Sequence, residues 1–202
     1  MIRFESVCLS FQDKNIFDNL DLNIQKNEKV LIQGRSGIGK TSLFKLLLGF
    51  GKVDSGNIIV NRLKIDRIHI NKIREQIFYL SQDIDLKQGV IGDLIDEILQ
   101  ANSKTNQDNN LNELLSFLEL EPKLLEQNIK DLSGGERQRI GLLICFLLDR
   151  PVWLLDEPTS ALDGALKNKV ASFILEQNKT IVIISHDNVW KQHKAIKIER
   201  FG

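Results

Sequence analysis

The sequence predicts an α/β fold in which helices cover both faces of a parallel sheet. Two continuous apolar runs, at 152–155 and 181–184, are typical of strands that are buried on both faces. A helix expected at about 166–177 separates these runs, and the order strand, helix, strand favours a parallel arrangement. Helical patterning over about 90–148 indicates that a helical insertion interrupts this core.

The remaining elements follow from periodicity and turn residues. Apolar and polar residues alternate at 2–7 and 20–24, as in half-buried strands, and short apolar runs predict strands at 29–33, 57–60 and 77–80. A helix is expected at 41–48, closed by Gly49 and Gly51. Leucines at 111, 114, 115 and 118 have the spacing of one helix face, and residues 195–199 predict a last short strand.

Composition is typical of a globular protein with a single domain. The chain has 202 residues, of which 42% are hydrophobic and 27% are charged. The 27 Lys and Arg residues balance the 27 Asp and Glu residues, so nothing indicates a broad basic surface for nucleic acid. The longest apolar run, 140–148, is about half of what a membrane-spanning helix needs, and Arg3 and Glu5 interrupt the first apolar stretch, unlike a secretory signal. We therefore expect a cytoplasmic protein.

A glycine-rich segment follows the strand expected at 29–33. Residues 34–41 match the pattern G-x-x-x-x-G-K-[ST] between a strand and a helix. Glycines let backbone amides turn toward phosphate oxygens, and the helix that starts here directs its positive end at them. Lys40 can reach the β and γ oxygens, and the Thr41 hydroxyl can hold Mg²⁺. The alternative is a glycine-rich turn without a ligand. The candidate phosphate-binding residues are Gly34, Arg35, Ser36, Gly37, Ile38, Gly39, Lys40, Thr41 and Ser42.

Two adjacent carboxylates end the strand expected at 152–155. They are Asp156 and Glu157, and they stand at the carboxyl end of a strand, where α/β sheets place ligands. Asp156 is a candidate ligand of Mg²⁺, and Glu157 is a candidate group for polarising an attacking water. Alone, such a pair of carboxylates is equally typical of a strand end that is merely exposed to solvent. Beside the phosphate loop it indicates phosphate chemistry.

A second helix start lies at Ser133. The run 132–138 reads Leu-Ser-Gly-Gly-Glu-Arg-Gln and precedes a long helical stretch. The hydroxyl of Ser133 and the bare amides of Gly134 and Gly135 can bind an anion at such a helix N-terminus. The alternative is an ordinary serine cap without a ligand.

Together these segments resemble the ATP-binding cassette (ABC) ATPases over essentially the whole chain. The resemblance rests on 34–41, 132–138, Leu154–Pro158 and Ser160–Asp163, in that order. It implies a P-loop NTPase with a RecA-like core, an ABC-type antiparallel β region and an inserted helical subdomain. The core of this single domain would be about 1–82 and 149–202, and the helical subdomain about 83–148. The compact form resembles small stand-alone bacterial subunits, although residues 141–145 are more apolar than in many members.

The resemblance also implies roles outside these motifs. Phe11 matches an aromatic that stacks on adenine, Gln82 a glutamine that senses Mg²⁺ and water, and His186 a histidine that contacts the γ-phosphate. Asp163 resembles an aspartate at a dimer contact. The alternatives are a core position for Phe11, a polar strand cap for Gln82 and a hydrolase triad for His186, but no G-x-S-x-G segment supports a triad. The candidate catalytic residues are Glu157, His186, Lys40 and Gln82, and the candidate metal ligands are Thr41, Gln82 and Asp156.

The activity implied by the resemblance is hydrolysis of ATP to ADP and phosphate with Mg²⁺. Because one chain has one copy of each motif, Ser133 and Gly135 of a second copy would close each site in an ATP-sandwich homodimer. The implied role is the ATPase subunit of an ABC transporter, on the cytoplasmic face of the cell membrane, coupled to a separate membrane permease. The segment 83–92 is expected to form part of the groove for that permease, with Ile84, Leu86, Val90 and Ile91 supplying its apolar surface. The alternative is a loop that packs on the chain's own core.

Two other functions remain as alternatives. A soluble ABC ATPase of an assembly or scaffold complex would have the same motifs. A nucleotide-binding module without turnover is disfavoured by the presence of both Glu157 and His186. No sustained heptads separate the two nucleotide motifs, which disfavours a chromosome-type ATPase and agrees with the absence of an expected nucleic-acid partner.

Overall fold

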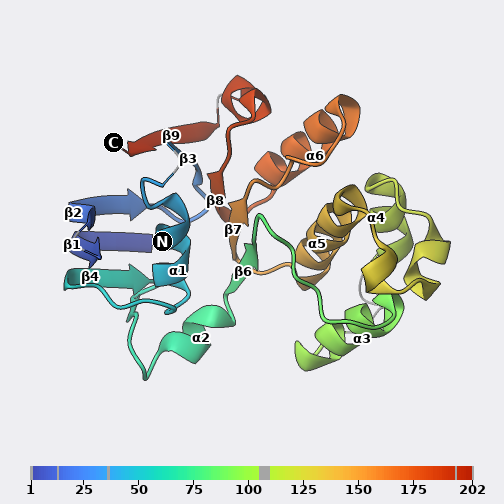
Figure 1. Ribbon diagram of the computed structural model, residues 1–202, viewed down its shortest axis with the longest axis horizontal. Coiled ribbons are helices and arrows are strands. Elements are labelled where there is room, and N and C mark those ends of the chain that lie inside the picture. The colour runs from blue at the N-terminus through green and yellow to red at the C-terminus, as the bar shows by residue number, and fades with distance from the viewer. Residues whose placement is uncertain (1, 13, 36, 105–109, 194, 202) are drawn as a thin grey trace.

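The computed structural model describes residues 2–12, 14–35, 37–104, 110–193 and 195–201. Within these residues, the strands form two sheets (Figure 1). The antiparallel sheet has the order β2-β1-β4-β5, with β1 at its centre paired to both β2 and β4. This sheet is the antiparallel β region that the resemblance implied. Its strands are Lys14–Ile24 for β2, Ile2–Phe11 for β1, Ser55–Val60 for β4 and Leu63–Lys64 for β5.

The second sheet is parallel and positions the functional residues. Its order is β6-β7-β8-β3-β9, which comprises Ile77–Leu80, Val152–Asp156, Thr180–Ile184, Lys29–Gly34 and Ile196–Phe201. Every residue of β7 and β8 is buried, so the two continuous apolar runs are central strands, as predicted. Successive side chains of β7 face opposite layers: Trp153 and Leu155 belong to one hydrophobic cluster, and Leu154 belongs to the other.

Helices cover both faces of the parallel sheet. On one face, α1 (Lys40–Leu47) shares a hydrophobic cluster with the antiparallel sheet. On the other, α5 (Gly134–Leu148) and α6 (Gly164–Glu176) share a cluster with β7 and β8, and α3 (Ile91–Ala101) and α4 (Leu111–Phe117) gather beside α5 (Figure 1). Short helices complete the described chain: α2 at Ile70–Arg74 and 3-10 turns at Pro122–Glu126, Ile129–Asp131 and Asn188–Gln192.

Helix α5 packs closely on the end of β6. A Cβ atom built at Gly141 would lie 2.6 Å from Leu80 Cδ1 and 2.9 Å from Ile84 Cδ1. The ends of the Leu80 and Ile84 side chains would have to shift to admit a larger residue at this position. This contact explains why glycine is accommodated at a position where α5 is apolar on all sides, over 140–148, and it places α5 against the strand that leads to Gln82.

The segment between β6 and α3 differs in part from its prediction. The sequence places Ile91 on an exposed surface, but this residue is fully buried at the start of α3, so the prediction is wrong there. The reason is the helical phase of α3, which turns Ile91, Leu94 and Ile95 into the same cluster. Ile84 and Leu86 are half-buried against that cluster, whereas Asp85 and Lys87 are exposed.

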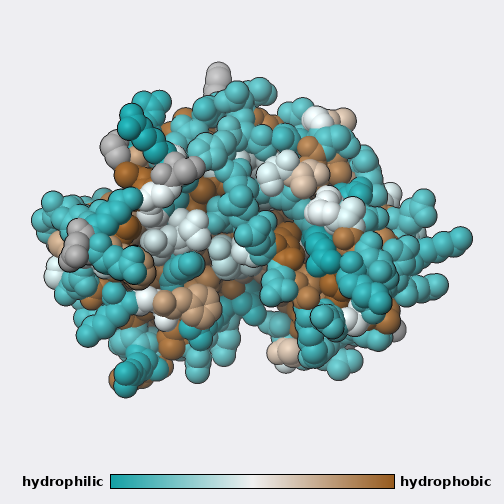
Figure 2. Space-filling view, viewed as in Figure 1, coloured by the Kyte–Doolittle hydropathy of each residue, from teal (hydrophilic) through white to brown (hydrophobic). Residues whose placement is uncertain are grey.

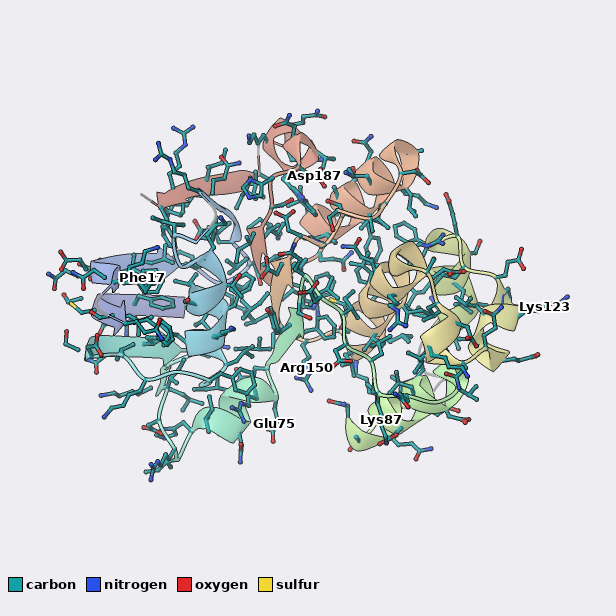
Figure 3. All side chains as sticks on the ribbon, in the orientation of Figure 1. Phe17, Glu75, Lys87, Lys123, Arg150 and Asp187 are labelled. Carbon is teal, nitrogen blue, oxygen red and sulfur yellow. The ribbon has the colours of Figure 1, made fainter. Side chains whose placement is uncertain are left out.

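Arg150 joins the core to the helices α3, α4 and α5 and the turns between them, which we call the helical layer (Figure 3). Its Nη1 donates to the carbonyl oxygens of Arg74 and Ile77, each at 2.6 Å, and its Nη2 donates to Asn102 Oδ1 at 2.7 Å. Burial lowers the pKa of this guanidinium, and the nearby Glu75 carboxylate opposes the shift. Because the planar group reaches α2, β6 and the end of α3 at once, it fixes where the helical layer meets the sheet.

Candidate functional site

The glycine-rich loop connects β3 to α1 and has a backbone that only glycine adopts readily. Gly37 and Gly39 have φ angles of 75° and 102°, in the left-handed region. A Cβ atom at Gly39 would collide with the Ile16 side chain, and one at Gly34 would lie 2.7 Å from the Phe201 carbonyl oxygen. The loop is therefore held tightly against β2 and β9. Ser36 lies outside the described residues.

The Lys40 side chain lies under this loop. Its Nζ donates to the carbonyl oxygens of Gly34 at 2.8 Å and Arg35 at 3.0 Å, and the residue is only 9% exposed. An ammonium has three donors, so two contacts to the loop leave one for a bound anion. These contacts orient the charge at the N-terminus of α1, where the helix dipole also favours an anion.

Asp156 and Thr41 meet at the carboxyl end of β7. The Thr41 hydroxyl donates to Asp156 Oδ2 at 3.1 Å, and Asp156 is 3% exposed. Burial raises the pKa of the Asp156 carboxyl, and the hydrogen bond from Thr41 opposes the shift. A hydroxyl and a carboxylate, with the amide oxygen of Gln82 in the same hollow, form the oxygen-only ligand set that Mg²⁺ prefers. The residues present therefore fit a magnesium ion.

Glu157 points its carboxylate toward the loop after β8. Its Oε2 accepts from the Ser185 hydroxyl at 2.8 Å, and its Oε1 accepts from the His186 backbone N–H at 3.1 Å. The His186 ring is exposed, with Nε2 3.9 Å from Glu157 Oε1. Glu157 itself has a φ of 49°, a conformation uncommon for a residue with a side chain. The carboxylates of Asp156 and Glu157 thus contact different groups.

A hollow of about 340 Å³ brings half of the predicted site residues together. It lies at the carboxyl ends of the central strands, as expected for this fold class. A larger hollow of about 910 Å³ lies between the segments 49–58 and 64–74, but it contains none of the predicted site residues. The smaller hollow is lined by Ile16, Gly37, Gly39, Lys40, Thr41, Ser42, Gln82, Asp156, Glu157, Ile184 and His186.

Other predicted residues do not line this hollow. Ser133 caps α5: its hydroxyl donates to Glu136 Oε2 at 2.6 Å and accepts from the Glu136 N–H. These hydrogen bonds lower the pKa of the Glu136 carboxyl. The amides of Gly134 and Gly135, in the first turn of α5, have no acceptor within the helix. Asp163 caps α6 by accepting from the N–H groups of Ala165 and Leu166, each at 3.0 Å.

Four further predicted residues do not line this hollow: Phe11, Gly34, Arg35 and Ile38. Phe11 ends β1 and is 67% exposed, so it is not the core residue of the alternative interpretation. Gly34 and Arg35 face Lys40 through their carbonyl oxygens, and the Ile38 N–H donates to the Arg35 carbonyl oxygen at 3.3 Å.

Sequence reasoning missed two residues that contact Glu157. Ser185 binds its carboxylate, and Gln138 donates to its carbonyl oxygen at 2.6 Å. Both stand in motifs that the sequence singled out, directly before His186 and at the end of 132–138. A serine or glutamine beside a motif is too common to assign without the contact itself.

Comparison with known proteins agrees with this geometry. A family model described as ABC transporter matches residues 17–160. The ATP-dependent lipid A-core flippase of Neisseria gonorrhoeae is 32% identical over 202 residues, covering 92% of this chain and 31% of that protein. The flippase of the same name from Methylobacillus flagellatus is also 32% identical, covering 92% of this chain and 34% of that protein. The chain thus spans only 31 to 34% of the length of these relatives.

Solved structures give the same picture of the fold. The dimeric structure of a bacterial ABC transporter cassette is 25% identical, with a TM-score of 0.85, and the match covers 100% of this chain and 95% of that one. A bacterial Atm1-family ABC exporter with ATP bound is 22% identical, with a TM-score of 0.84, and the match covers 100% of this chain and 37% of that one. The second likeness concerns the fold alone.

Proposed function

This chain belongs to the ABC transporter family, and from that premise we propose that it is the ATP-hydrolysing subunit of a transporter, coupled to a separate membrane protein. The observation that carries the proposal is the single hollow in which Lys40, Thr41, Asp156 and Glu157 converge. Within the described ranges, no helix is long and apolar enough to cross a membrane. The transported substrate would be handled by the membrane protein, and this chain would work on its cytoplasmic face.

The loop and α1 would bind the phosphates of ATP. Backbone amides at 37–42 and the free donor of Lys40 supply positive charge to the β- and γ-phosphate oxygens. Thr41, Asp156 and Gln82 would hold Mg²⁺, which would supply positive charge to offset the negative charge of the phosphates. Phe11, exposed at the end of β1, would stack on adenine.

Hydrolysis would take place between Glu157 and His186. A water oxygen attacks the γ-phosphorus, the bond from that phosphorus to the β–γ bridging oxygen breaks, and ADP leaves with that oxygen. Glu157 takes the proton of the attacking water. His186 donates to a γ-phosphate oxygen, and Gln82 orients the water. Products are ADP and phosphate, and the proton passes from Glu157 to solvent.

A second copy of this chain would complete each site. Ser133, Gly134, Gly135 and Asp163 do not line the hollow of their own chain, and the first amides of α5 are open to an incoming anion. Because the Ser133 hydroxyl already donates to Glu136, the amides of Gly134 and Gly135 are the principal donors to the γ-phosphate of the other copy. A site closed from two sides surrounds the charge of the transferred phosphoryl group.

Phosphate release from ATP tests this proposal. Specific activity with Mg²⁺ should rise with protein concentration in the dilute range, because the site needs two chains. Release should stop when EDTA removes Mg²⁺. A specific activity that is constant at all protein concentrations, for a protein that sedimentation shows to be monomeric, would contradict the shared site.

Replacing Phe11 tests the adenine contact. Phe11→Ala should raise the ATP dissociation constant about tenfold or more, because a base–aromatic stack is lost. Phe11→Tyr and Phe11→Trp should have small effects. Phe50 is a matched control, since it is 68% exposed and lies by the other hollow, so Phe50→Ala should leave ATP affinity unchanged. Equal affinity of Phe11→Leu and the parent protein would show that an aromatic ring is not required.

The permease would dock on the segment 83–90, at the junction of the core and the helical layer. Figure 2 shows a mainly hydrophilic face in which hydrophobic side chains gather near this junction. A hollow of about 410 Å³ adjoins Asp83, Ile84 and Asp85, and it extends to Gly134 at the start of α5. Lys87 pairs with Glu97 at 2.8 Å, and both side chains are more than 60% exposed, so the rim is charged and accessible. The partly apolar surface with a charged rim fits a protein partner.

Charge reversal tests the docking surface. Asp85→Lys with Lys87→Glu should abolish capture of the membrane partner and coupled transport, while basal ATP hydrolysis should persist because neither side chain lines the nucleotide hollow. Leu86→Asp is a poorer probe, since Leu86 packs on the core cluster. Lys123→Glu is the control, because Lys123 lies elsewhere on the helical layer (Figure 3). Loss of basal hydrolysis with unchanged capture would place the docking surface elsewhere.

A further inference from the structure

Gln138 connects helix α5 to the segment that contains Glu157. The side chain is 4% exposed. Its Nε2 donates to the Glu157 carbonyl oxygen at 2.6 Å, and its Oε1 accepts from the Ala161 N–H at 2.7 Å. These partners fix the orientation of the amide, since the reverse orientation would oppose two oxygens and two N–H groups. One buried side chain therefore binds two points of the segment 157–161.

The backbone that Gln138 holds is an unusual one. Glu157 has a φ of 49°, which a residue with a side chain adopts only where neighbours hold it there. Its N–H donates to the Ile184 carbonyl oxygen at 2.8 Å, and Ser160 contributes a hydroxyl donor to its carbonyl oxygen at 3.1 Å. The contact from Gln138 to that same oxygen is shorter, at 2.6 Å. This conformation directs the Glu157 carboxylate toward Ser185.

Helix α5 contains two groups with different proposed roles. Its first turn holds the amides of Gly134 and Gly135, and Gln138 follows one turn later on the same helix. Gln138 therefore joins the N-terminal part of α5 to the Glu157 backbone through direct hydrogen bonds.

We propose that Gln138 is a positioning residue that makes the conformation of Glu157 depend on the position of α5. Phosphate bound by the α5 N-terminus at the other copy's site would then orient the carboxylate of this chain's own site. Each site of the dimer would prepare the other for hydrolysis. The inference rests on the proposed function, in which Glu157 takes the proton of the attacking water.

Two variants separate positioning from folding. Gln138→Met keeps the volume and loses both hydrogen bonds, whereas Gln138→Glu keeps an acceptor for Ala161 and loses the donor to Glu157. In both, kcat should fall about tenfold or more with KM within about twofold of the parent. The Hill coefficient for ATP hydrolysis should fall from about 2 to about 1, because the two sites no longer communicate. A merely structural defect would lower the fraction of folded protein and leave the Hill coefficient unchanged.

A control and a double variant complete the experiment. Arg139 is the neighbour of Gln138, but its Nη1 donates to the Glu119 carbonyl oxygen at 2.9 Å, so Arg139→Gln should keep the parent kcat and Hill coefficient. The double variant Gln138→Met with Glu157→Gln should have the same residual single-turnover rate as Glu157→Gln alone. Gln138 acts by positioning the Glu157 carboxylate, so its loss has no further effect once that carboxylate is gone.

The outcomes distinguish this inference from the proposed function. If Glu157→Gln abolishes turnover but both Gln138 variants keep the parent kcat and Hill coefficient, the inference is wrong and the proposed function stands. If Glu157→Gln itself keeps turnover, the proposed function fails and the inference fails with it. If Gln138→Met does not fold, Gln138→Glu decides the question alone, since it retains a polar group for Ala161.

Discussion

Glu157→Gln is expected to lower ATP turnover about 100-fold or more, because it removes the group that takes the proton of the attacking water. The change is nearly isosteric. The Gln oxygen can still accept from the His186 N–H, and the Ser185 hydroxyl can accept from the new amide group. ATP affinity should therefore stay within about twofold of the parent value.

Single-turnover phosphate release and equilibrium ATP binding measure the two quantities separately. With ATP bound and not hydrolysed, the variant should also accumulate as a dimer in sedimentation experiments. Glu113→Gln is a matched control on the exposed face of α4 and should retain parent turnover and a parent dimer population. Turnover of Glu157→Gln within a few-fold of the parent would remove Glu157 from the proposed reaction.

Lys40→Ala should weaken ATP binding itself, by about ten- to a hundredfold, because a charged donor to the β- and γ-phosphates is lost. The substitution also leaves the carbonyl oxygens of Gly34 and Arg35 without their donor, so the loop should become less ordered even without nucleotide. Both effects act on binding, which distinguishes this variant from Glu157→Gln.

Calorimetric titration with ATP measures the effect directly. Lys45→Ala is the control, since Lys45 is exposed near the end of the same helix and is not among the residues that line the hollow. Unchanged affinity of Lys40→Ala would show that the backbone amides of the loop bind the phosphates without the ammonium. Loss of affinity in both variants would instead indicate a general loss of α1.

The sequence anticipated most of the strands and most of the helices because their signals are local. Continuous apolar runs identified β7 and β8 as buried parallel strands, and alternation identified parts of β1 and β2. β5 and α2 escaped prediction because two and five residues are too short to have a period. Ile91 was misplaced because the first residue of a helix faces inward or outward according to the phase of the whole helix.

By itself, the sequence predicted the residues of the candidate site. The spacing of 34–41 specifies a loop whose glycines turn amides inward and whose lysine follows at the helix start, and these are properties of consecutive residues. The pair Asp156 and Glu157 is determined in the same way, as the end of an apolar strand. Such local patterns also identify the family, because each of them is a short run of consecutive residues.

Only the tertiary structure decided how these pieces act on one another. Glu157 has a left-handed backbone, and it contacts Gln138 of α5 and Ser185, which follows β8, only in the folded chain. The same packing leaves Ser133 outside the hollow of its own chain, which makes a second copy necessary for the proposed site. No spacing in the sequence encodes these relations, because each depends on the distance between elements far apart in the chain. Close packing, such as that of the Leu80 side chain on the backbone at Gly141, sets that distance.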